Sequence, residues 1–229
     1  MPITLTQTTG LIAMLGAAVY AIGDVLLLAA RANLADYPNL QPHAKLLSGA
    51  EKMVVLPWWR LMWGGLLGVF ATPLLVIGLW PLYYGLAPAG VWAVWPVVLL
   101  LGAGFIMAPF VHGTFVFLGE YVQALNTLSG EAQTVVTQML VRFRSLLMIS
   151  YGAVMVAILG ASLWFSASVW LGATRFPQWM AAVNPLTAFG VWLVLRRIVP
   201  PLGDWLEGAG FNIAFLLFFA AVTTALGQG

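Results

Sequence analysis

Three ionisable side chains in apolar surroundings are the residues of this sequence that could carry a proton: Asp24, His112 and Glu120. An ionisable group costs roughly 2.5 to 3.5 kcal/mol near the centre of a membrane helix, so such a group usually has a partner or a function. Histidine exchanges a proton near neutral pH, and carboxylates act as general acids or bases. These residues are our candidate catalytic groups.

Each candidate also has a structural explanation. Asp24 could fix its helix to an arginine such as Arg60, and His112 could hydrogen-bond to a neighbouring carbonyl. Glu120 lies eight residues after His112, which places both on roughly the same side of a helix, but Glu120 could be a solvated helix end. Both explanations stay open for all three residues.

Four further residues are candidates for ligand binding. Tyr20 precedes Asp24 by one helical turn on the same face. Arg60 and Trp63 begin a second apolar stretch, and Asn212 begins the last one. Arg60 could instead be an anchor that extends to lipid headgroups.

The composition indicates a membrane protein. Only 7% of the residues are charged and 62% are hydrophobic, whereas a soluble domain has roughly 25% charged residues. Backbone amides in hydrocarbon must pair within their own segment, so each apolar span should be a helix. We predict an all-α fold, a polytopic transmembrane bundle of about six spanning helices forming a single domain over residues 1–229. The predicted spans are residues 10–30, 61–84, 91–118, 146–171, 179–195 and 211–226.

Lysine and arginine are concentrated in alternate connections between these spans. The first, third and fifth connections are rich in them, whereas the second has none and the fourth has only Arg175. The positive-inside rule then places the odd connections in the cytoplasm and both termini outside. The candidate residues would fall in the inner half of the membrane, as expected either for a polar pocket near the cytoplasmic side or for ordinary decoration of helix ends.

Two cytoplasmic connections are longer than simple turns. Residues 44–55 could form a short amphipathic helix along the membrane surface. Ser129 could cap a helix that begins at Gly130. The apolar stripe that follows favours a cytoplasmic extension of the fourth span over a helix that binds a partner.

Several chemistries are not expected. The chain has no cysteine and only two histidines, His43 and His112, and it lacks an HExxH pattern, so we predict no metal site. No lysine lies inside a span, and no phosphate-binding loop or serine-hydrolase motif occurs, so we expect no cofactor. The net charge of +2 has no clustered run, which argues against nucleic acid as a partner.

Several short strings carry a resemblance to a known family. They are Gly23–Asp24, Trp59–Gly65, Trp80–Tyr84, Pro200–Pro201 and Gly210–Asn212. With these strings the chain resembles a family of uncharacterised six-helix bacterial integral membrane proteins, a domain of unknown function. The resemblance implies six helices in the cytoplasmic (inner) membrane of a bacterium and assigns no activity.

Three functions are consistent with these residues. The first is binding of, or acid-base chemistry on, a lipophilic small molecule such as a lipid or an isoprenoid. The second is an accessory or structural subunit of a larger membrane complex. The third is a small proton-linked transporter that uses Asp24 and His112 as a relay. The expected partners are membrane lipids, with either a lipophilic ligand or another membrane subunit, and whether the protein is an enzyme stays open.

Overall fold

The computed structural model describes residues 4–227, without the side chain of Leu202, and these residues form helices and connections with no strand. Its long helices are α1 (Leu5–Leu28), α3 (Trp58–Ile77), α5 (Val91–Thr127), α6 (Gly130–Trp170) and α9 (Gly210–Gly227). The shorter ones are α2 (Ala44–Leu47), α4 (Leu79–Leu86), α7 (Pro185–Ile198) and α8 (Pro200–Trp205), with 3-10 turns η1 (Leu34–Asp36), η2 (Gln41–His43), η3 (Glu51–Val55), η4 (Ala87–Ala89) and η5 (Gln178–Ala182). The all-α prediction is confirmed.

Five segments among the described residues are long and apolar enough to cross a membrane. Four coincide with α1, α5, α6 and α9, and the fifth runs from Trp58 to Ala89 through α3 and α4. Segments of about 20 apolar residues match the thickness of a bilayer. The fold is therefore compatible with a protein embedded in a membrane.

The predicted span 179–195 is not one long helix, which corrects the fifth of our six predicted spans. Residues 178–182 form η5, and α7 begins only at Pro185. Asn184 causes this late start, because its side-chain oxygen accepts hydrogen bonds from the main-chain nitrogens of Leu186 and Thr187, and proline is favoured at the first helical position. With 14 residues α7 is only about 21 Å long.

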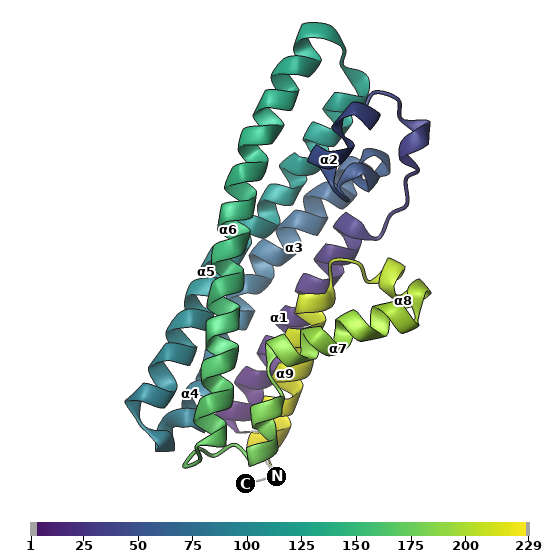
Figure 1. Cartoon of the computed structure of the whole chain (residues 1–229). Helices are drawn as coiled ribbons and strands as arrows, with labels where there is room; N and C mark the ends of the chain where they lie inside the picture. Colours follow the sequence, from purple (N-terminus) through teal and green to yellow (C-terminus); the bar gives the residue numbers. More distant parts are fainter. Residues whose placement is uncertain (1–3, 228–229) are drawn as a thin grey trace.

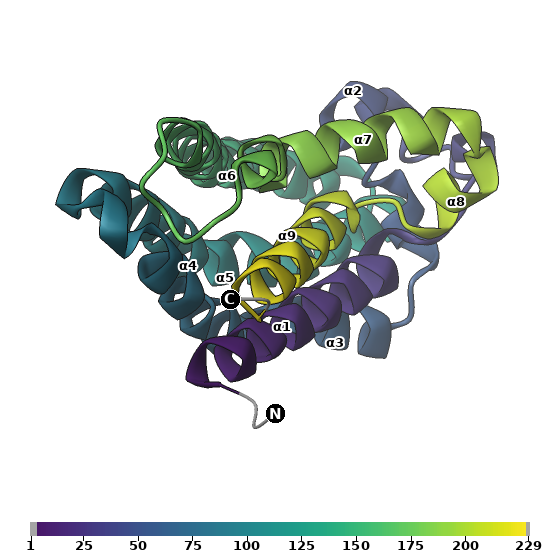
Figure 2. The ribbon, with the colours of Figure 1, turned by 90° about the horizontal axis from the view of Figure 1, so that it is seen from below.

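The long helices form two packed pairs joined through α3. Helix α1 packs along α9 and α3, and α5 packs along α6 and α3. Figure 2 shows α9 beside α1, with α7 running across α9 on the outside. The first turn of α1 meets the end of α9, because a Cβ on Gly227 would lie 2.6 Å from Nε2 of Gln7. The start of α1 and the end of α9 therefore lie at the same end of the bundle.

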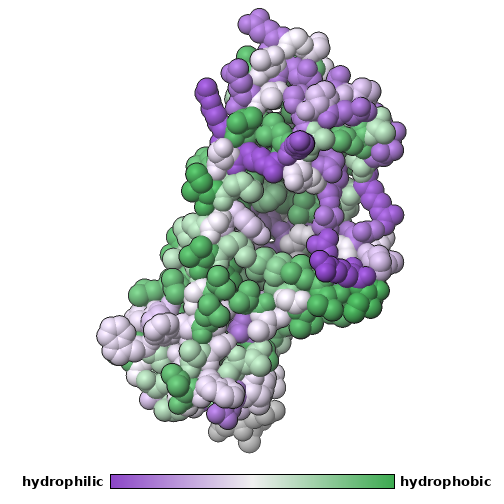
Figure 3. Space-filling view, in the orientation of Figure 1, coloured by the Kyte–Doolittle hydropathy of each residue, from purple (hydrophilic) through white to green (hydrophobic). Residues whose placement is uncertain are grey.

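Helices α5 and α6 extend beyond the other helices at the opposite end (Figure 1). They contain 37 and 41 residues, lengths of about 55 and 60 Å, whereas the hydrocarbon core of a bilayer is about 30 Å thick. Figure 3 shows hydrophilic residues gathered at this end and hydrophobic residues over the middle of the molecule. The predicted extension of the fourth span is confirmed, although Ser129 occupies the cap position without a side-chain capping bond.

The connection between α1 and α3 corrects a second expectation. Residues 44–55 do not form one amphipathic helix, because Ser48 and Gly49 have positive φ angles of 42° and 93° and separate α2 from η3. The segment packs on the bundle, with Leu47 and Met53 buried. Gln123 on α5 donates hydrogen bonds to the carbonyl oxygens of Met53 and Leu56, at 3.2 and 2.8 Å.

Candidate functional site

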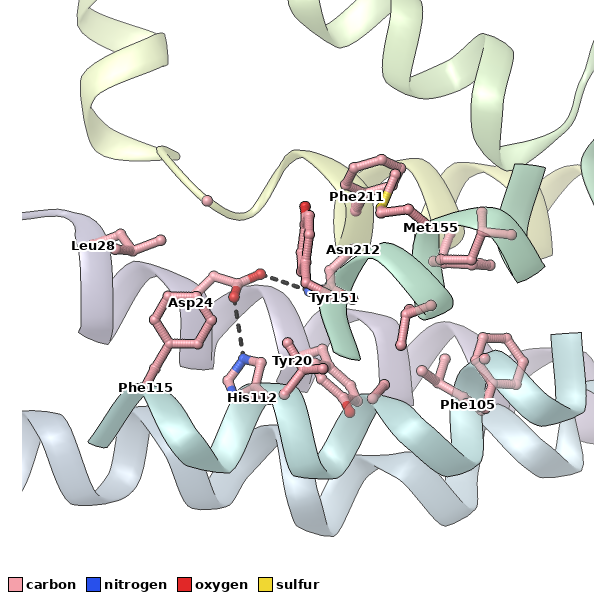
Figure 4. Close-up of a pocket in the computed structure, with 18 residues that line it drawn as sticks. Tyr20, Asp24, Leu28, Phe105, His112, Phe115, Tyr151, Met155, Phe211 and Asn212 are labelled. Carbon is pink, nitrogen blue, oxygen red and sulfur yellow. Dashed lines mark hydrogen bonds and ion pairs between the residues drawn. The ribbon is translucent and has the colours of Figure 1, made fainter. Parts of the chain in front are cut away.

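A polar network lies at the side of a cavity between the α1–α9 pair and the α5–α6 pair (Figure 4). Asp24 of α1 is its centre. Its Oδ1 lies 3.1 Å from Nε2 of His112 on α5, and its Oδ2 accepts a hydrogen bond of 2.6 Å from Nδ2 of Asn212 on α9. Asp24 and His112 are only 8% and 7% exposed. Three residues separated by up to 188 positions in the sequence thus form one cluster, in which Asp24 and His112 are buried and Asn212 is partly buried.

The partners of His112 limit where its protons can be. Its Nδ1 lies 3.2 Å from the carbonyl oxygen of Gly65, which can only accept, so Nδ1 carries a hydrogen. Its Nε2 faces the Asp24 carboxyl group, and this contact forms a hydrogen bond only when one proton lies on either the ring or the carboxyl group. The two residues can therefore hold one proton between them, as an ion pair or as a neutral pair.

Glycines on α3 provide the space for the imidazole ring. A Cβ on Gly68 would lie 2.5 Å from Cγ of His112, which is closer than real Cβ contacts come. A Cβ on Gly23 of α1 would lie 2.8 Å from the carbonyl oxygen of Gly64 and 3.1 Å from Cε1 of His112. The absence of side chains at these positions lets α1, α3 and α5 approach closely, as small residues commonly do in membrane bundles. The GxxxG pair Gly64 and Gly68 therefore serves packing within one chain.

Tyr20 also contacts the imidazole ring of His112. It makes an edge-to-face contact with His112, with ring centroids 4.9 Å apart. The Thr72 hydroxyl donates to the carbonyl oxygen of Gly68 at 3.1 Å and so accepts the hydrogen bond of 2.8 Å from the Tyr20 hydroxyl. Tyr20 lines the cavity, and its hydroxyl group already has a partner within the protein.

Arg60 does not pair with Asp24, so the predicted pairing with this arginine is wrong, although Asp24 does join α1 to α5 and α9 through His112 and Asn212. Its guanidinium group instead donates to the carbonyl oxygens of the last turn of α1: Leu26 at 3.0 Å, and Val25 and Ala29 at 3.2 Å each. The last carbonyl groups of a helix lack partners inside that helix. Arg60 thus caps the end of α1, one turn beyond Asp24, and is absent from the cavity lining.

Glu120 and Trp63 also lie away from the cavity lining. Both are exposed on the helical surface, Trp63 to 46%. At 100° per residue, eight residues rotate a helix by about 80° beyond two full turns, so Glu120 points outward where His112 points inward. Of the seven predicted site residues, the cavity lining includes four: Tyr20, Asp24, His112 and Asn212.

The rest of the cavity wall is apolar and aromatic. The cavity has a volume of about 150 Å³, similar to an engineered apolar cavity of ~150 Å³ that binds benzene. It is partly open to the outside, and Tyr151, which is 39% exposed, lines it from α6. Phenylalanines from α5 and α9 supply most of the aromatic surface, namely Phe105, Phe115, Phe211 and Phe215.

Sequence reasoning missed Tyr151, Thr72 and the phenylalanine wall. Tyr151 and Thr72 are isolated polar side chains within apolar spans, the signal that identified Asp24, so both could have been found in the same way. The phenylalanines carry no such signal, because aromatic residues occur throughout this sequence. Among residues 4–227 no group of three or more His, Asp and Glu side chains is arranged to hold a metal ion.

Comparisons with known proteins identify a family but no characterised relative. No curated protein and no solved structure matches the chain. The model of the family of unknown function DUF6796 matches residues 1–227, nearly the whole sequence. Because the match covers the cavity and all five long helices, the chain belongs to the DUF6796 family.

Proposed function

We propose that this membrane protein binds a lipophilic small molecule, such as a lipid or an isoprenoid, in the cavity beside Asp24 and His112. The observation that carries the proposal is the combination of an apolar wall with a small group of convergent polar side chains. Ligand sites are usually concave and apolar, with few polar groups that fix the orientation of the ligand. Here Asp24, His112 and Asn212 are those groups.

The cavity volume supports a ligand that enters only in part. A volume of about 150 Å³ holds a ring or a short hydrocarbon segment, and the partly open side leaves room for the remainder of a longer molecule. The proton held between Asp24 and His112 could be donated to a hydroxyl or carbonyl oxygen of the ligand. The same pair could act as a general acid and base if the ligand is also a substrate.

We further propose how the bundle is oriented in the membrane. Five long apolar helices support several crossings, and the start of α1 and the end of α9 lie at one end of the bundle. The opposite end contains Lys52 and Arg144, so the positive-inside rule places it in the cytoplasm and the termini outside. The membrane would be the bacterial inner membrane, as the resemblance to six-helix bacterial proteins implies.

Mass spectrometry of small molecules extracted from protein purified in native lipid particles tests the proposal. The key variant is Asp24→Asn, because asparagine still accepts from Asn212 and donates to a neutral His112 but cannot hold the shared proton. The matched control is Glu120→Gln, a carboxylate removed outside the cavity.

We expect one lipophile at about one molecule per chain in the wild type and in Glu120→Gln, and its depletion in folded Asp24→Asn. Bulk lipid alone in all three preparations would contradict binding. Equal retention in all three would contradict the role of the Asp24 carboxyl group.

A proton-linked transporter is the second candidate, favoured by the buried acid-base pair that can share one proton. Its distinguishing readout is proton movement in sealed vesicles that contain the purified protein, measured with a pH-sensitive dye under an imposed pH gradient. A transporter predicts a flux that Asp24→Asn abolishes, whereas binding alone predicts no flux in the wild type.

A further inference from the structure

A second hollow lies next to the cavity, at the end of the bundle that carries the cationic residues. It has a volume of about 330 Å³ and lies between the α1–α3 connection, α5, α6, the end of α7 and the loop before α9. Four charged residues line it: Lys52, Arg144, Arg196 and Glu207. Three of the four are cations, so the hollow has an excess of positive charge.

One of these cations is already paired. Lys52 forms a salt bridge with Glu207, and its side chain is only 12% exposed. Arg144 donates to the carbonyl oxygen of Lys45 at 3.3 Å, a neutral acceptor, and no carboxylate lies within salt-bridge distance of Arg144 or Arg196 among the described residues. The two arginines therefore retain the capacity to bind an anion. Arginine is suited to phosphate, because its planar group can donate two parallel hydrogen bonds.

The hollow and the cavity share part of their walls. Leu28 at the end of α1, Phe115 on α5 and Gly208 before α9 line both. Gly208 has a φ of 85°, and a Cβ there would lie 2.2 Å from Cδ1 of Leu28, so a glycine keeps the loop close to α1 at this junction. The cationic hollow thus borders the apolar cavity directly, with the Asp24 cluster on the cavity side.

We infer that the ligand is an amphiphile with a phosphate headgroup, in which Arg144 and Arg196 bind the phosphate and the apolar portion passes Leu28 and Phe115 into the cavity. This inference rests on the proposed function and names its ligand class. Apolar walls and free arginines in adjacent spaces match the two ends of such a molecule. A neutral isoprenoid or hydrocarbon would use only the cavity.

The test is native mass spectrometry of the full-length protein in phosphatidylcholine nanodiscs containing a small fraction of phosphatidic acid. The double variant Arg144→Gln/Arg196→Gln is compared with Arg142→Gln/Arg197→Gln. Arg142 and Arg197 are exposed neighbours on the same two helices and do not line the hollow. Both double variants remove two positive charges, so only the position of the charges differs.

We expect enrichment of phosphatidic acid in the wild type and a loss of about a hundredfold in Arg144→Gln/Arg196→Gln, since each arginine removed loses at least one hydrogen bond to a charged group and therefore about tenfold in affinity. The Arg142→Gln/Arg197→Gln control should retain the enrichment. An equal loss in both variants would indicate general surface attraction and would overturn the inference, as would no loss in either.

Two further arms identify the source of the phosphate and separate this inference from the proposed function. Excess inorganic phosphate should leave the bound lipid in place. Complete displacement of the lipid by inorganic phosphate would show that the site binds free phosphate and would overturn the inference of an amphiphilic ligand. A third result would separate the two claims: a neutral lipophile is extracted from the wild type and from Arg144→Gln/Arg196→Gln in equal amounts but is lost in Asp24→Asn. The proposed function would then stand, and the inference of a phosphate headgroup would be wrong.

Discussion

The two walls of the cavity differ in how firmly they are fixed. On the wall formed by α1, α3 and α5, Asp24, His112 and Tyr20 all have hydrogen-bond partners within the protein. On the wall formed by α6 and α9, Asn212 alone among the lining residues hydrogen-bonds to this cluster, and Tyr151 and Met155 are not fully buried. Apolar contacts are non-directional, so the first wall should set the geometry of the polar groups and the second should adapt to the ligand.

The largest loss of stability should follow from removing the Asp24 side chain, at the centre of the wall formed by α1, α3 and α5. Asp24→Ala removes the partner of both His112 and Asn212. Loss of one member of a buried pair costs about 3 kcal/mol or more, because the other member is left without compensation. A clear drop in the unfolding midpoint, measured in detergent with increasing denaturant, is expected. The isosteric Asp24→Asn should lose much less, and an equal loss in both would show that charge matters more than hydrogen bonding.

Filling the space that Gly68 leaves for the imidazole ring of His112 should give the next largest loss of stability. Gly68→Ala places a Cβ 2.5 Å from the imidazole ring, and such overpacking costs about 2 kcal/mol. Gly152→Ala on α6 is the matched control, because a Cβ there meets nothing within 4 Å. The measurement is the thermal midpoint of each variant in lipid particles. A Gly68→Ala midpoint as high as that of Gly152→Ala would show that the ring is not confined.

Tyr20→Phe should have a smaller effect. It removes the hydrogen bond to Thr72 but keeps the ring against His112, and Thr72 retains its own bond to the carbonyl oxygen of Gly68. We expect a loss of about 1 kcal/mol. Tyr83→Phe, a half-exposed tyrosine whose hydroxyl group makes no hydrogen bond within residues 4–227, should leave the midpoint unchanged. The comparison fails if the two substitutions shift the midpoint equally.

The sequence alone predicted the polar part of the site better than its surroundings. Asp24, His112 and Asn212 were identified because polar groups are costly in apolar helices, and that argument requires no knowledge of how helices pack. The role of Arg60 was not predictable in this way, since an arginine at a helix end can pair with a carboxylate or with carbonyl groups. Glu120 was wrongly predicted to lie on the same side of the helix as His112. Eight residues rotate a helix by about 80° beyond two full turns, so the two side chains point in different directions.

The same distinction applies to the fold. Long apolar stretches identified the five long helices, because hydrocarbon requires main-chain hydrogen bonds within each segment. Span 179–195 is also composed mainly of apolar residues, but the local preference of Asn184 and Pro185 for a helix start divides it. Reading these two residues as a cap would have predicted α7 correctly.

The central claim is that the cavity holds a lipophilic ligand. A bulky substitution on α6 that fills the cavity tests this claim most directly. Met155→Trp adds bulk where Met155 lines the cavity, and Val156→Trp adds it one residue later, where the side chain is 69% exposed. Native mass spectrometry of both variants in native lipid particles would measure the ligand carried by each chain. We predict that Met155→Trp loses the ligand that the wild type and Val156→Trp retain. Retention of the same ligand by folded Met155→Trp would contradict the claim.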